Sequence, residues 1–456
     1  MQIKKNIIYT LIANISRVVL SLVLVVSGFV KAVDPVGFMY KLQEYTKALS
    51  VEAFSDDWLL FFAIVMAALE FLMGVFMFMG VYRRFISTLA FALMIVFTIF
   101  TTYVYFAAPV DDCGCFGDAF ELTNGATVIK NILLLLLSAA VFFGRRRLVW
   151  NISARNRWMV VIFSFFYIAV VEGMSLSSLP VLDFRPYAVG NNLREMVEGA
   201  PEVYEIKHVY EKDGERMVFS DSLPDSSWNF VESRSELVKE GEEPLIGDFS
   251  IVDWETDEDI AAGLLADTGY VCIVAIEFVE RASVSRVDKV NDLYDYCVEN
   301  NVPFLAATAS GEEEIALWRR RTGAEYPIYW ADNMMLRTMV RSNPGIVLLN
   351  NGVVVGKWSA DGIPDVDSYS SSSKASNKLF KDFDRNSGMG FWMLLLIVPL
   401  VVIGLLDALM ARYKRSKKPR GLPKEGATLP VEEPAVPEIQ KPDEEPEATE
   451  EKKIQE

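Results

Sequence analysis

Two of the four cysteines in the chain stand close enough together to act as one group. The segment PVDDCGCFGDAF holds Cys113 and Cys115 on either side of Gly114. A disulfide across so short a spacing requires a bend, which glycine permits at little steric cost. Structural crosslinks normally close long loops, so this one would constrain the unfolded chain little. We therefore expect a redox-active dithiol at Cys113 and Cys115, with a metal site and a turn without chemistry as alternatives.

The charges around these cysteines limit their reactivity. Asp111, Asp112 and Asp118 surround the pair, and no Lys or Arg between residues 107 and 127 offsets them. Like charges disfavour the thiolate, so the dithiol would attack slowly, although its disulfide could still accept electrons. The carboxylates and thiolates are also metal-ligand types. However, C-x₂-C half-sites are absent and the single histidine, His208, is remote in sequence, which makes metal the less favoured interpretation.

Long apolar runs place this segment beside a membrane. Hydrophobic residues make up 52% of the 456 residues while the formal net charge is −17, a combination that a single soluble domain does not show. About 20 apolar residues cross a bilayer core. Six segments qualify: Ile7–Val30, Trp58–Gly80, Phe85–Ala107, Ala126–Phe143, Trp158–Leu179 and Met389–Met410. The first is too long for a signal peptide and has no A-x-A-like cleavage site, so we expect an uncleaved span.

Positively charged residues near the spans predict their orientation. The clusters Lys4-Lys5, Arg83-Arg84, Arg145 to Arg147 and Arg412 to Arg420 all fall on one side if the chain crosses six times. That side is the cytoplasmic one by the positive-inside rule. We therefore expect a multi-pass protein of the cytoplasmic (inner) membrane with both termini in the cytoplasm. The cysteine segment would then face the periplasm, where disulfides persist.

The chain divides into six parts by composition and pattern. They are a membrane bundle at 1–147, a fifth span at 158–179, a β-rich lead-in at 180–245, an α/β domain at 246–365, a sixth span at 389–410 and a tail at 411–456. In the lead-in, alternating runs around Asp213-Gly214 predict a hairpin. The tail is rich in Pro and Glu and has little to bury, so we expect it to be disordered.

From Ile246 onward, strand-like and helix-like segments alternate, which predicts a mixed sheet with helices on both faces. This order resembles the thioredoxin fold, and the resemblance implies a cis peptide before Pro344. The C-x-x-C of that family would fall in VERASVSR, Val279 to Arg286, which has no cysteine. Cys272 and Cys297 are expected to be buried and inert. Without a thiolate the domain cannot exchange disulfides, so we expect it to bind or position a partner.

The first four spans also have recognisable details. The stretch SRVVLSLVLVVSGFVKAVDP, the second-span stretch MAALEFLMG and the CGCFGD loop together resemble the DoxX/MauE group of four-helix membrane proteins, over about Asn6 to Arg146. The loop residues that carry the resemblance are Cys113, Gly114, Cys115, Phe116, Gly117 and Asp118. The whole layout resembles a two-part form of that family, and implies membrane-linked redox work or maturation of exported proteins. The fold class we expect is a mainly α membrane protein: a four-helix bundle, two further spans, and an inserted extracytoplasmic α/β thioredoxin-like domain.

Two charged residues lie about halfway along apolar runs, Arg17 in the first span and Glu70 in the second. A charge in the bilayer is expensive and normally finds a partner or a polar interior. Each is about halfway along its span, so adjacent antiparallel helices could pair them. An ion pair that fixes helix register is one interpretation, and a proton-handling site or quinone contact is the other.

These observations support two functions of different classes. The first is a membrane thiol-disulfide oxidoreductase, in which Cys113 and Cys115 pass electrons between an exported thiol substrate and a membrane acceptor, with quinone as a candidate. The second is a non-enzymatic assembly factor whose silent α/β domain binds an exported client. Small-solute transport is weaker, because paired broken helices are absent from the sequence pattern. The expected partners are the lipid bilayer and an exported protein; we expect no nucleic acid, no covalently bound cofactor and no metal.

Overall fold

The computed structural model describes most of the chain up to Lys417. The described residues are 2–50, 54–107, 114–119, 122–149, 152–199, 203–212, 215–219, 228–239, 241, 244–363 and 387–417. Cys113 with its two preceding aspartates, the turn at Asp213-Gly214 and the tail beyond Lys417 lie outside them, as does the side chain of Asp118.

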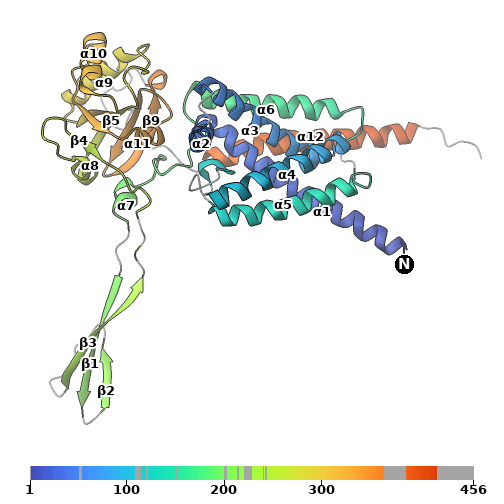
Figure 1. Ribbon diagram of the computed structural model, residues 1–456, viewed down its shortest axis with the longest axis horizontal. Coiled ribbons are helices and arrows are strands. Elements are labelled where there is room, and N and C mark those ends of the chain that lie inside the picture. Colours follow the sequence, from blue (N-terminus) through green and yellow to red (C-terminus); the bar gives the residue numbers. More distant parts are fainter. Residues whose placement is uncertain are drawn as a thin grey trace, which may run out of the picture. The chain divides into compact units, whose positions relative to one another are not determined.

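Within the described residues, six helices are long and apolar enough to cross a membrane, as the sequence predicted. They run side by side in Figure 1. These helices are α1 (Gln2–Val33), α3 (Asp56–Met79), α4 (Arg83–Ala107), α5 (Asn124–Gly144), α6 (Arg157–Ser177) and α12 (Ser387–Lys417). Helix α12 extends beyond the predicted span, through Ala411 to Lys417, into the segment that we expected to be disordered.

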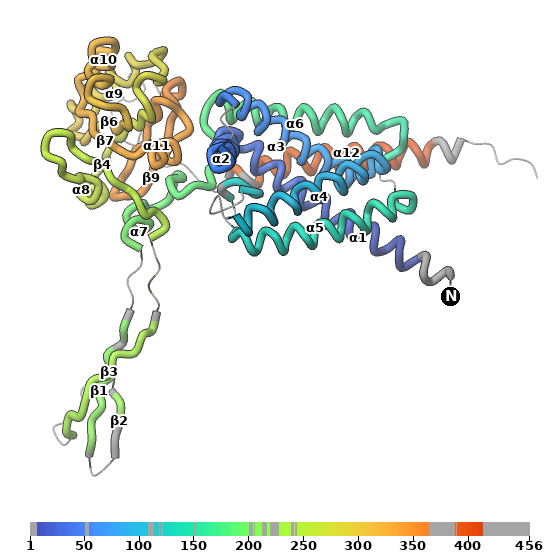
Figure 2. Tube along the Cα trace, in the orientation of Figure 1, coloured from blue at the N-terminus to red at the C-terminus, as the bar shows by residue number. Residues whose placement is uncertain are grey.

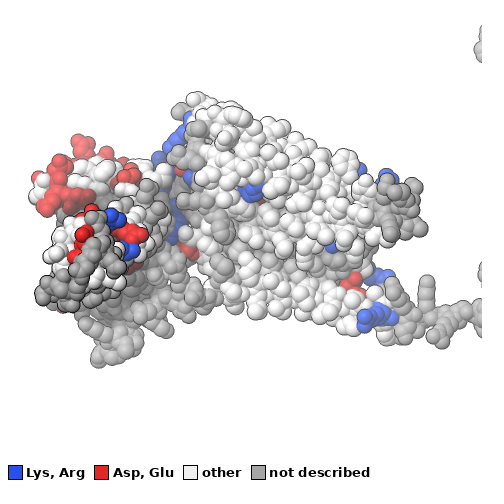
Figure 3. All heavy atoms as spheres, turned by 90° about the horizontal axis from the view of Figure 1, so that it is seen from below, with Lys and Arg blue, Asp and Glu red and all other residues white. Residues whose placement is uncertain are grey.

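The outside of this bundle is apolar. Large side chains such as Ile99, Phe106, Ile129 and Phe143 are strongly exposed, which in water would be an aggregation hazard and in a bilayer is contact with lipid. Figure 3 shows a bundle face with few charged side chains along its length. A lipid environment for these helices follows from their composition and exposure.

A further helix, α2 (Pro35–Ala48), lies between the first two spans and was not predicted. Its start is encoded locally: Asp34 is the N-cap, and its carboxylate accepts a hydrogen bond of 2.8 Å from the backbone N–H of Gly37. Pro35 occupies the first helical position, where its missing N–H is not needed. Helix α2 is amphipathic and has only fourteen residues, too few to cross a bilayer, so apolar length did not indicate it.

Helices α1 and α3 approach each other very closely. A Cβ atom on Gly28 would collide with backbone atoms of Ala67 and Phe71, and one on Gly74 would collide with Val25 and the carbonyl of Ser21. Glycine at both contacts allows the two backbones to pack directly, as small residues do between membrane helices. These contacts fix an antiparallel register between α1 and α3.

The lead-in contains a three-stranded antiparallel sheet in the order β2-β1-β3. Its strands are β1 (Val203–Lys212), β2 (Glu215–Phe219) and β3 (Asn229–Lys239), and they lie side by side in Figure 2. Lys212 pairs with Glu215, so β1 and β2 form the hairpin that the sequence predicted around Asp213-Gly214. A short helix, α7 (Leu193–Glu198), precedes the sheet.

A six-stranded mixed sheet follows, in the order β4-β7-β6-β5-β8-β9. Strands β5, β6 and β7 are parallel, while β4, β8 and β9 run antiparallel to their neighbours. The strands are β4 (Ile251–Val252), β5 (Tyr270–Ile276), β6 (Phe304–Thr308), β7 (Ile328–Ala331), β8 (Gly345–Asn350) and β9 (Val353–Ser359). The predicted mixed sheet is therefore present, and the predicted hairpin at Asn351-Gly352 joins β8 to β9.

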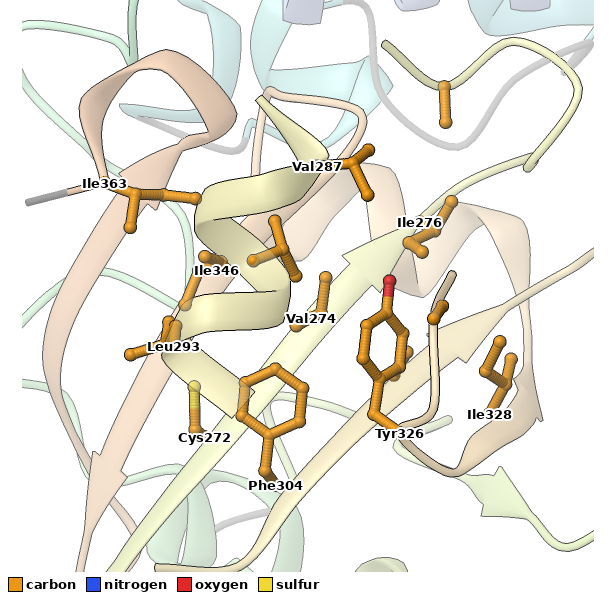
Figure 4. Close-up of a cluster of buried hydrophobic side chains, with 14 of the residues drawn as sticks. Cys272, Val274, Ile276, Val287, Leu293, Phe304, Tyr326, Ile328, Ile346 and Ile363 are labelled. Atoms are coloured by element: carbon orange, nitrogen blue, oxygen red, sulfur yellow. The ribbon is translucent and has the colours of Figure 1, made fainter. Parts of the chain in front are cut away.

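Helices cover both faces of this sheet. The helices are α8 (Ala261–Ala266), α9 (Val287–Glu299), α10 (Glu312–Thr322) and α11 (Asn333–Met339). Alternate residues of β5 point to opposite sides: Cys272 and Val274 pack toward α9 and α10, while Ile273 and Ala275 pack toward α8 and α11. Figure 4 shows the first of these cores, with Cys272 below Leu293 of α9. A strand buried on both faces explains the continuous apolar run in the sequence.

Candidate functional site

The loop that carries the cysteines is described from Gly114 onward. Gly114 has φ +58°, a left-handed conformation that confirms the bend expected at this glycine. The backbone N–H of Gly117 donates to the carbonyl oxygen of Gly114 over 3.1 Å, and a short 3₁₀ helix, η1 (Gly117–Ala119), follows. Cys113 lies outside the described residues, so the geometry of the site is built from Cys115.

Cys115 is attached to the first membrane helix. Its carbonyl oxygen accepts a hydrogen bond of 2.8 Å from the hydroxyl of Ser27 on α1. The cysteine is disulfide-bonded, whereas Cys272 and Cys297 are free and buried. The loop is therefore held against the bundle by its backbone, and its sulfur is in the oxidised form.

A buried ion pair lies one helical turn further along α1. The ammonium of Lys31 is 2.6 Å from Oε2 of Glu70 on α3, and it also donates to the hydroxyl of Ser27 over 3.1 Å. Both charged side chains are buried. Ser27 thus connects the ion pair to the backbone of Cys115, because it accepts from Lys31 and donates to the loop.

The expected pairing of Arg17 with Glu70 is wrong. Arg17 instead donates from Nη1 to the carbonyl oxygen of Val149 over 2.7 Å, in the segment after α5. The register of α1 against α3, fixed at Gly28 and Gly74, explains this. It places Arg17 level with the last turn of α3, on the order of 15 Å along the helix axis from Glu70.

A cavity of about 480 Å³ opens inside the bundle next to the cysteine loop. This volume is in the range of small-molecule sites. Helices α1 to α5 and the loop all contribute to its wall. Among the lining residues are Cys115, Phe116, Lys31, Glu70, Lys130 and Asn131. The arrangement brings one of the two predicted cysteines, the intramembrane glutamate and two lysines to a single space.

The rest of the wall is largely apolar and aromatic, including Phe38, Phe97, Phe100 and Leu134. The polar groups are few and held in place. Nδ2 of Asn131 donates to the hydroxyl of Thr101 over 3.0 Å, and the ammonium of Lys130 lies 4.4 Å from the ring centroid of Phe116. An apolar site with a few fixed polar groups is the usual form of a small-molecule pocket.

The cysteines of the six-stranded sheet are not part of this site. Cys272 and Cys297 are fully buried beside each other, and the hydrogen bond between their thiols together with burial raises the pKa of the Cys272 thiol. A buried thiol with a raised pKa forms little thiolate and is unreactive. The prediction that both thiols are buried is confirmed, and their lack of reactivity stays a prediction.

The peptide before Pro344 is cis, as expected from the sequence. The side chain of Asn343 donates to the carbonyl oxygen of Phe278, over 3.0 Å, in the loop after β5. Phe278 immediately precedes VERASVSR, where a C-x-x-C would have been found, and within that stretch the backbone N–H of Ser283 donates to the carbonyl oxygen of Asn343 over 2.9 Å. The cis peptide therefore lies beside the segment expected, and no cysteine is in it.

A second buried charge cluster lies in the region between α6 and the six-stranded sheet. Asp183 accepts two hydrogen bonds from the guanidinium of Arg185 and one of 2.6 Å from Lys357 on β9. Burial alone would raise the pKa of Asp183, but these two cations hold it well below its usual range. Burial, with Arg185 nearby, lowers the pKa of Lys357 to about 8 although Asp183 opposes the shift.

No group of three or more His, Cys, Asp or Glu side chains suited to a metal occurs among the residues that the structure describes. Cys113 and the two aspartates before it are not among them. The metal interpretation of the loop therefore stays an untested alternative.

Sequence reasoning identified Cys115 and Glu70 but missed Lys31 as the partner of Glu70, and missed Ser27, Lys130 and Asn131 entirely. The sequence did contain one indication of Lys31 and Ser27. Ser27 and Lys31 stand four residues apart, so they share a face of α1. No pattern of that kind marks Lys130 or Asn131 as cavity residues, because their position beside the loop depends on how α5 packs in the bundle.

With this geometry in view, the chain can be compared with known proteins. The model of the family described as methylamine utilisation protein MauE matches residues 9–144. This stretch is similar to MauE. It spans α1 to α5 and includes every cavity residue named above, which supports a MauE-like membrane protein. A second family model, a domain of unknown function (DUF8463), matches residues 204–240, the three-stranded sheet. No curated protein and no solved structure matches the chain.

Proposed function

We propose that this protein is a membrane thiol-disulfide redox protein that accepts electrons from an exported thiol substrate and passes them to an acceptor in the membrane. The observation that carries the proposal is that disulfide-bonded Cys115 lies in the wall of a cavity inside the bundle. A disulfide between an outer loop and a membrane cavity has access to two kinds of reactant. One is a protein thiol in the periplasm, and the other is a small acceptor in the bilayer.

In this proposal Cys113 is the partner of Cys115. Cys113 lies outside the described residues, and the other two cysteines, Cys272 and Cys297, are free. In the first half-reaction, a client dithiol attacks the Cys113–Cys115 disulfide and leaves as a client disulfide. Two electrons and two protons then reside on the Cys113 and Cys115 thiols. In the second half-reaction, the membrane acceptor takes the two electrons and the two protons, and the S–S bond forms again.

The domain around the six-stranded sheet has a different role in this proposal. We infer that it is a thioredoxin-like fold without its own redox pair, on the support of its mixed sheet and the cis peptide at Pro344. Its thiols, Cys272 and Cys297, are buried, so it would hold a client and not react with it. The basic clusters near the spans support a cytoplasmic-membrane location with this domain in the periplasm.

The test is the redox state of the cysteine pair in intact cells. Trapping with a maleimide that adds a known mass to each reduced thiol should find Cys113 and Cys115 partly oxidised. The reduced fraction should rise when respiration is inhibited. Cys113→Ser should abolish oxidation of the client. Cys272→Ser, which alters a buried free thiol, is the matched control and should leave oxidation intact. A pair that stays reduced under all conditions, or a Cys113→Ser variant with normal activity, would refute the proposal.

A non-enzymatic assembly factor is the second candidate. The matched family is described as methylamine utilisation protein MauE, and the buried thiols of the α/β domain favour binding over chemistry there. Crosslinking from the α/β domain should then capture one exported protein, and the Cys113→Ser and Cys115→Ser variants should mature it normally. Loss of maturation in those variants would favour the redox function.

A further inference from the structure

We propose that the cavity binds the ring of an isoprenoid quinone that enters from the lipid, and that Lys31 with Glu70 supplies the proton donor for its reduction. This inference rests on the proposed function, because it names the acceptor of the electrons from the Cys113–Cys115 dithiol.

The mouth of the cavity faces lipid. Five large apolar residues of its wall are also exposed: Leu49 is 44% exposed, Phe54 46%, Phe62 41%, Met66 36% and Val96 57%. Phe62 and Met66 are on α3 and Val96 is on α4, both of which are membrane-spanning helices. A ligand can therefore enter between α3 and α4 without passing through water, which suits a hydrophobic molecule dissolved in the bilayer.

The inner end of the cavity is polar. Lys31 donates to Glu70 over 2.6 Å and to Ser27 over 3.1 Å. An ammonium has three protons, and in the described part of the chain these bonds use two of them. The third can be donated to a carbonyl oxygen of a ligand. A site of this kind distinguishes a quinone, which has carbonyl acceptors, from a lipid acyl chain, which has none.

A second set of donors lines the wall contributed by α5. Asn131 is held by its bond to Thr101, and its amide keeps another N–H for a ligand. Lys130 beside it lies over the ring of Phe116, the residue after Cys115. A quinone carries two carbonyls on opposite sides of a flat ring. The aromatic wall, with Phe97 and Phe100, fits the flat ring.

The redox step balances without a further reactant. The two thiols lose two electrons and two protons and form the S–S bond, while each quinone carbonyl becomes a hydroxyl. Lys31 donates a proton to the nearer oxygen as negative charge develops there, and it is reprotonated from the thiol pair. Glu70 pairs with Lys31 and orients it in the membrane, where an unpaired ammonium would be costly.

The first experiment measures binding alone. The full chain, purified in lipid nanodiscs, is irradiated with a photoreactive azido-ubiquinone, and the labelled peptides are mapped by mass spectrometry. We expect labelling of α3 and α4 peptides that unlabelled ubiquinone competes away. Leu134→Trp, which fills the cavity, should abolish labelling. Leu136→Trp, on the same helix but 63% exposed, is the matched control and should retain it.

The outcomes separate this inference from the proposed function. A Cys113→Ser, Cys115→Ser double variant should still be labelled, because binding needs no thiol. Labelling without any client oxidation in the wild type would refute the redox function while the quinone site stands. Absence of competed labelling in the wild type, or a phospholipid that occupies the cavity and resists displacement, would overturn the quinone site whatever the cysteines do.

The second experiment tests Lys31. With quinone as the sole oxidant, Lys31→Met should slow reoxidation of the dithiol roughly a hundredfold, the scale of losing one donor to a developing oxyanion. A Lys31→Glu, Glu70→Lys exchange keeps the ion pair but moves the donor. We expect it to fold and to bind quinone, as judged by labelling, while reoxidation stays slow. Reoxidation at the wild-type rate in either variant would remove Lys31 from the reaction.

Discussion

Individual charged residues decide much of this structure because they are buried with few partners. Asp183 is the clearest case outside the membrane. The side chains of Arg185 and Lys357 are 2% and 4% exposed, and Asp183 is the carboxylate that contacts both. Removing it would leave two cations buried together, which is more costly than losing a surface ion pair.

Asp183→Asn should therefore lower the free energy of unfolding by about 3–5 kcal/mol at pH 7, as loss of one partner in a buried pair does. The pKa of Asp183 is lower in the folded chain than its ordinary value of 3.8. The contribution of the Asp183 carboxylate to the free energy of unfolding is therefore complete above pH 3.8 and is lost as the pH falls from there through the lower pKa of the folded chain. Thermal unfolding of both full-length proteins should show a large difference at pH 7 that narrows below about pH 4.

As a control, Arg194→Gln breaks the exposed pair of Arg194 with Glu198, and it should change stability by less than about 1 kcal/mol. An equal difference between wild type and Asp183→Asn at pH 7 and pH 3 would contradict the assignment of a depressed pKa.

At the scale of helices, the contact of α1 with α3 determines which residues meet in the membrane. Gly28 and Gly74 hold the two backbones together, and this register puts Lys31 beside Glu70. The spans themselves follow from apolar length and could be predicted from the sequence. The register could not, because it depends on which glycines face each other across two helices. The predicted partner Arg17 was wrong for that reason.

Gly28→Ala should destabilise the bundle by about 1–3 kcal/mol, since the new Cβ overlaps the backbone of Phe71 and the helices must separate. Gly173→Ala on α6 is the matched control, because a Cβ there meets nothing within 4 Å. We expect this control to be neutral or slightly stabilising. Thermal unfolding in detergent measures both, and equal melting temperatures for the two variants would contradict the close contact.

At the scale of the whole chain, the last helix is connected to the middle of the sequence. Asp407 on α12 accepts hydrogen bonds from the backbone N–H of Ser153 over 2.9 Å and from Nδ2 of Asn156 over 2.7 Å. Near the other end of α12, the hydroxyl of Tyr167 donates to the carbonyl oxygen of Trp392 over 2.8 Å. Asp407 is buried, and its partners lie just before the start of α6.

Asp407→Ala should lower the free energy of unfolding by about 1.5–3 kcal/mol, because hydrogen bonds to a charged group are lost and the side chain of Asn156 stays buried. Leu406→Ala, at a neighbouring position that is 44% exposed, should have a small effect. Crosslinking of α12 to α6 through cysteines introduced near Trp392 and Tyr167 would report the docking directly. Undiminished crosslinking and stability in Asp407→Ala would show that this carboxylate is dispensable.

Sequence patterns predicted the six spans, the mixed sheet and the burial of Cys272 and Cys297, because apolar length and periodicity show within single segments. The cis peptide before Pro344 was implied by the resemblance to the thioredoxin fold. Sequence patterns did not predict α2, whose fourteen residues are too few and too polar for a span. They also did not predict the cavity, because its wall combines residues from five helices and a loop. Cys115 could be singled out beforehand, but Lys130 and Asn131 could not, since nothing in α5 marks them as facing the loop.

The cavity mouth between α3 and α4 has a kinetic consequence. A reactant that arrives through that mouth never equilibrates with the aqueous phase at the site, so its effective concentration is its mole fraction in the bilayer. Turnover would then follow surface-dilution kinetics: adding phospholipid at constant total reactant would slow the reaction, although nothing in the water had changed. If the proposed reaction takes place, the exposure of Phe62 and Val96 at this mouth would place its rate under the control of membrane composition.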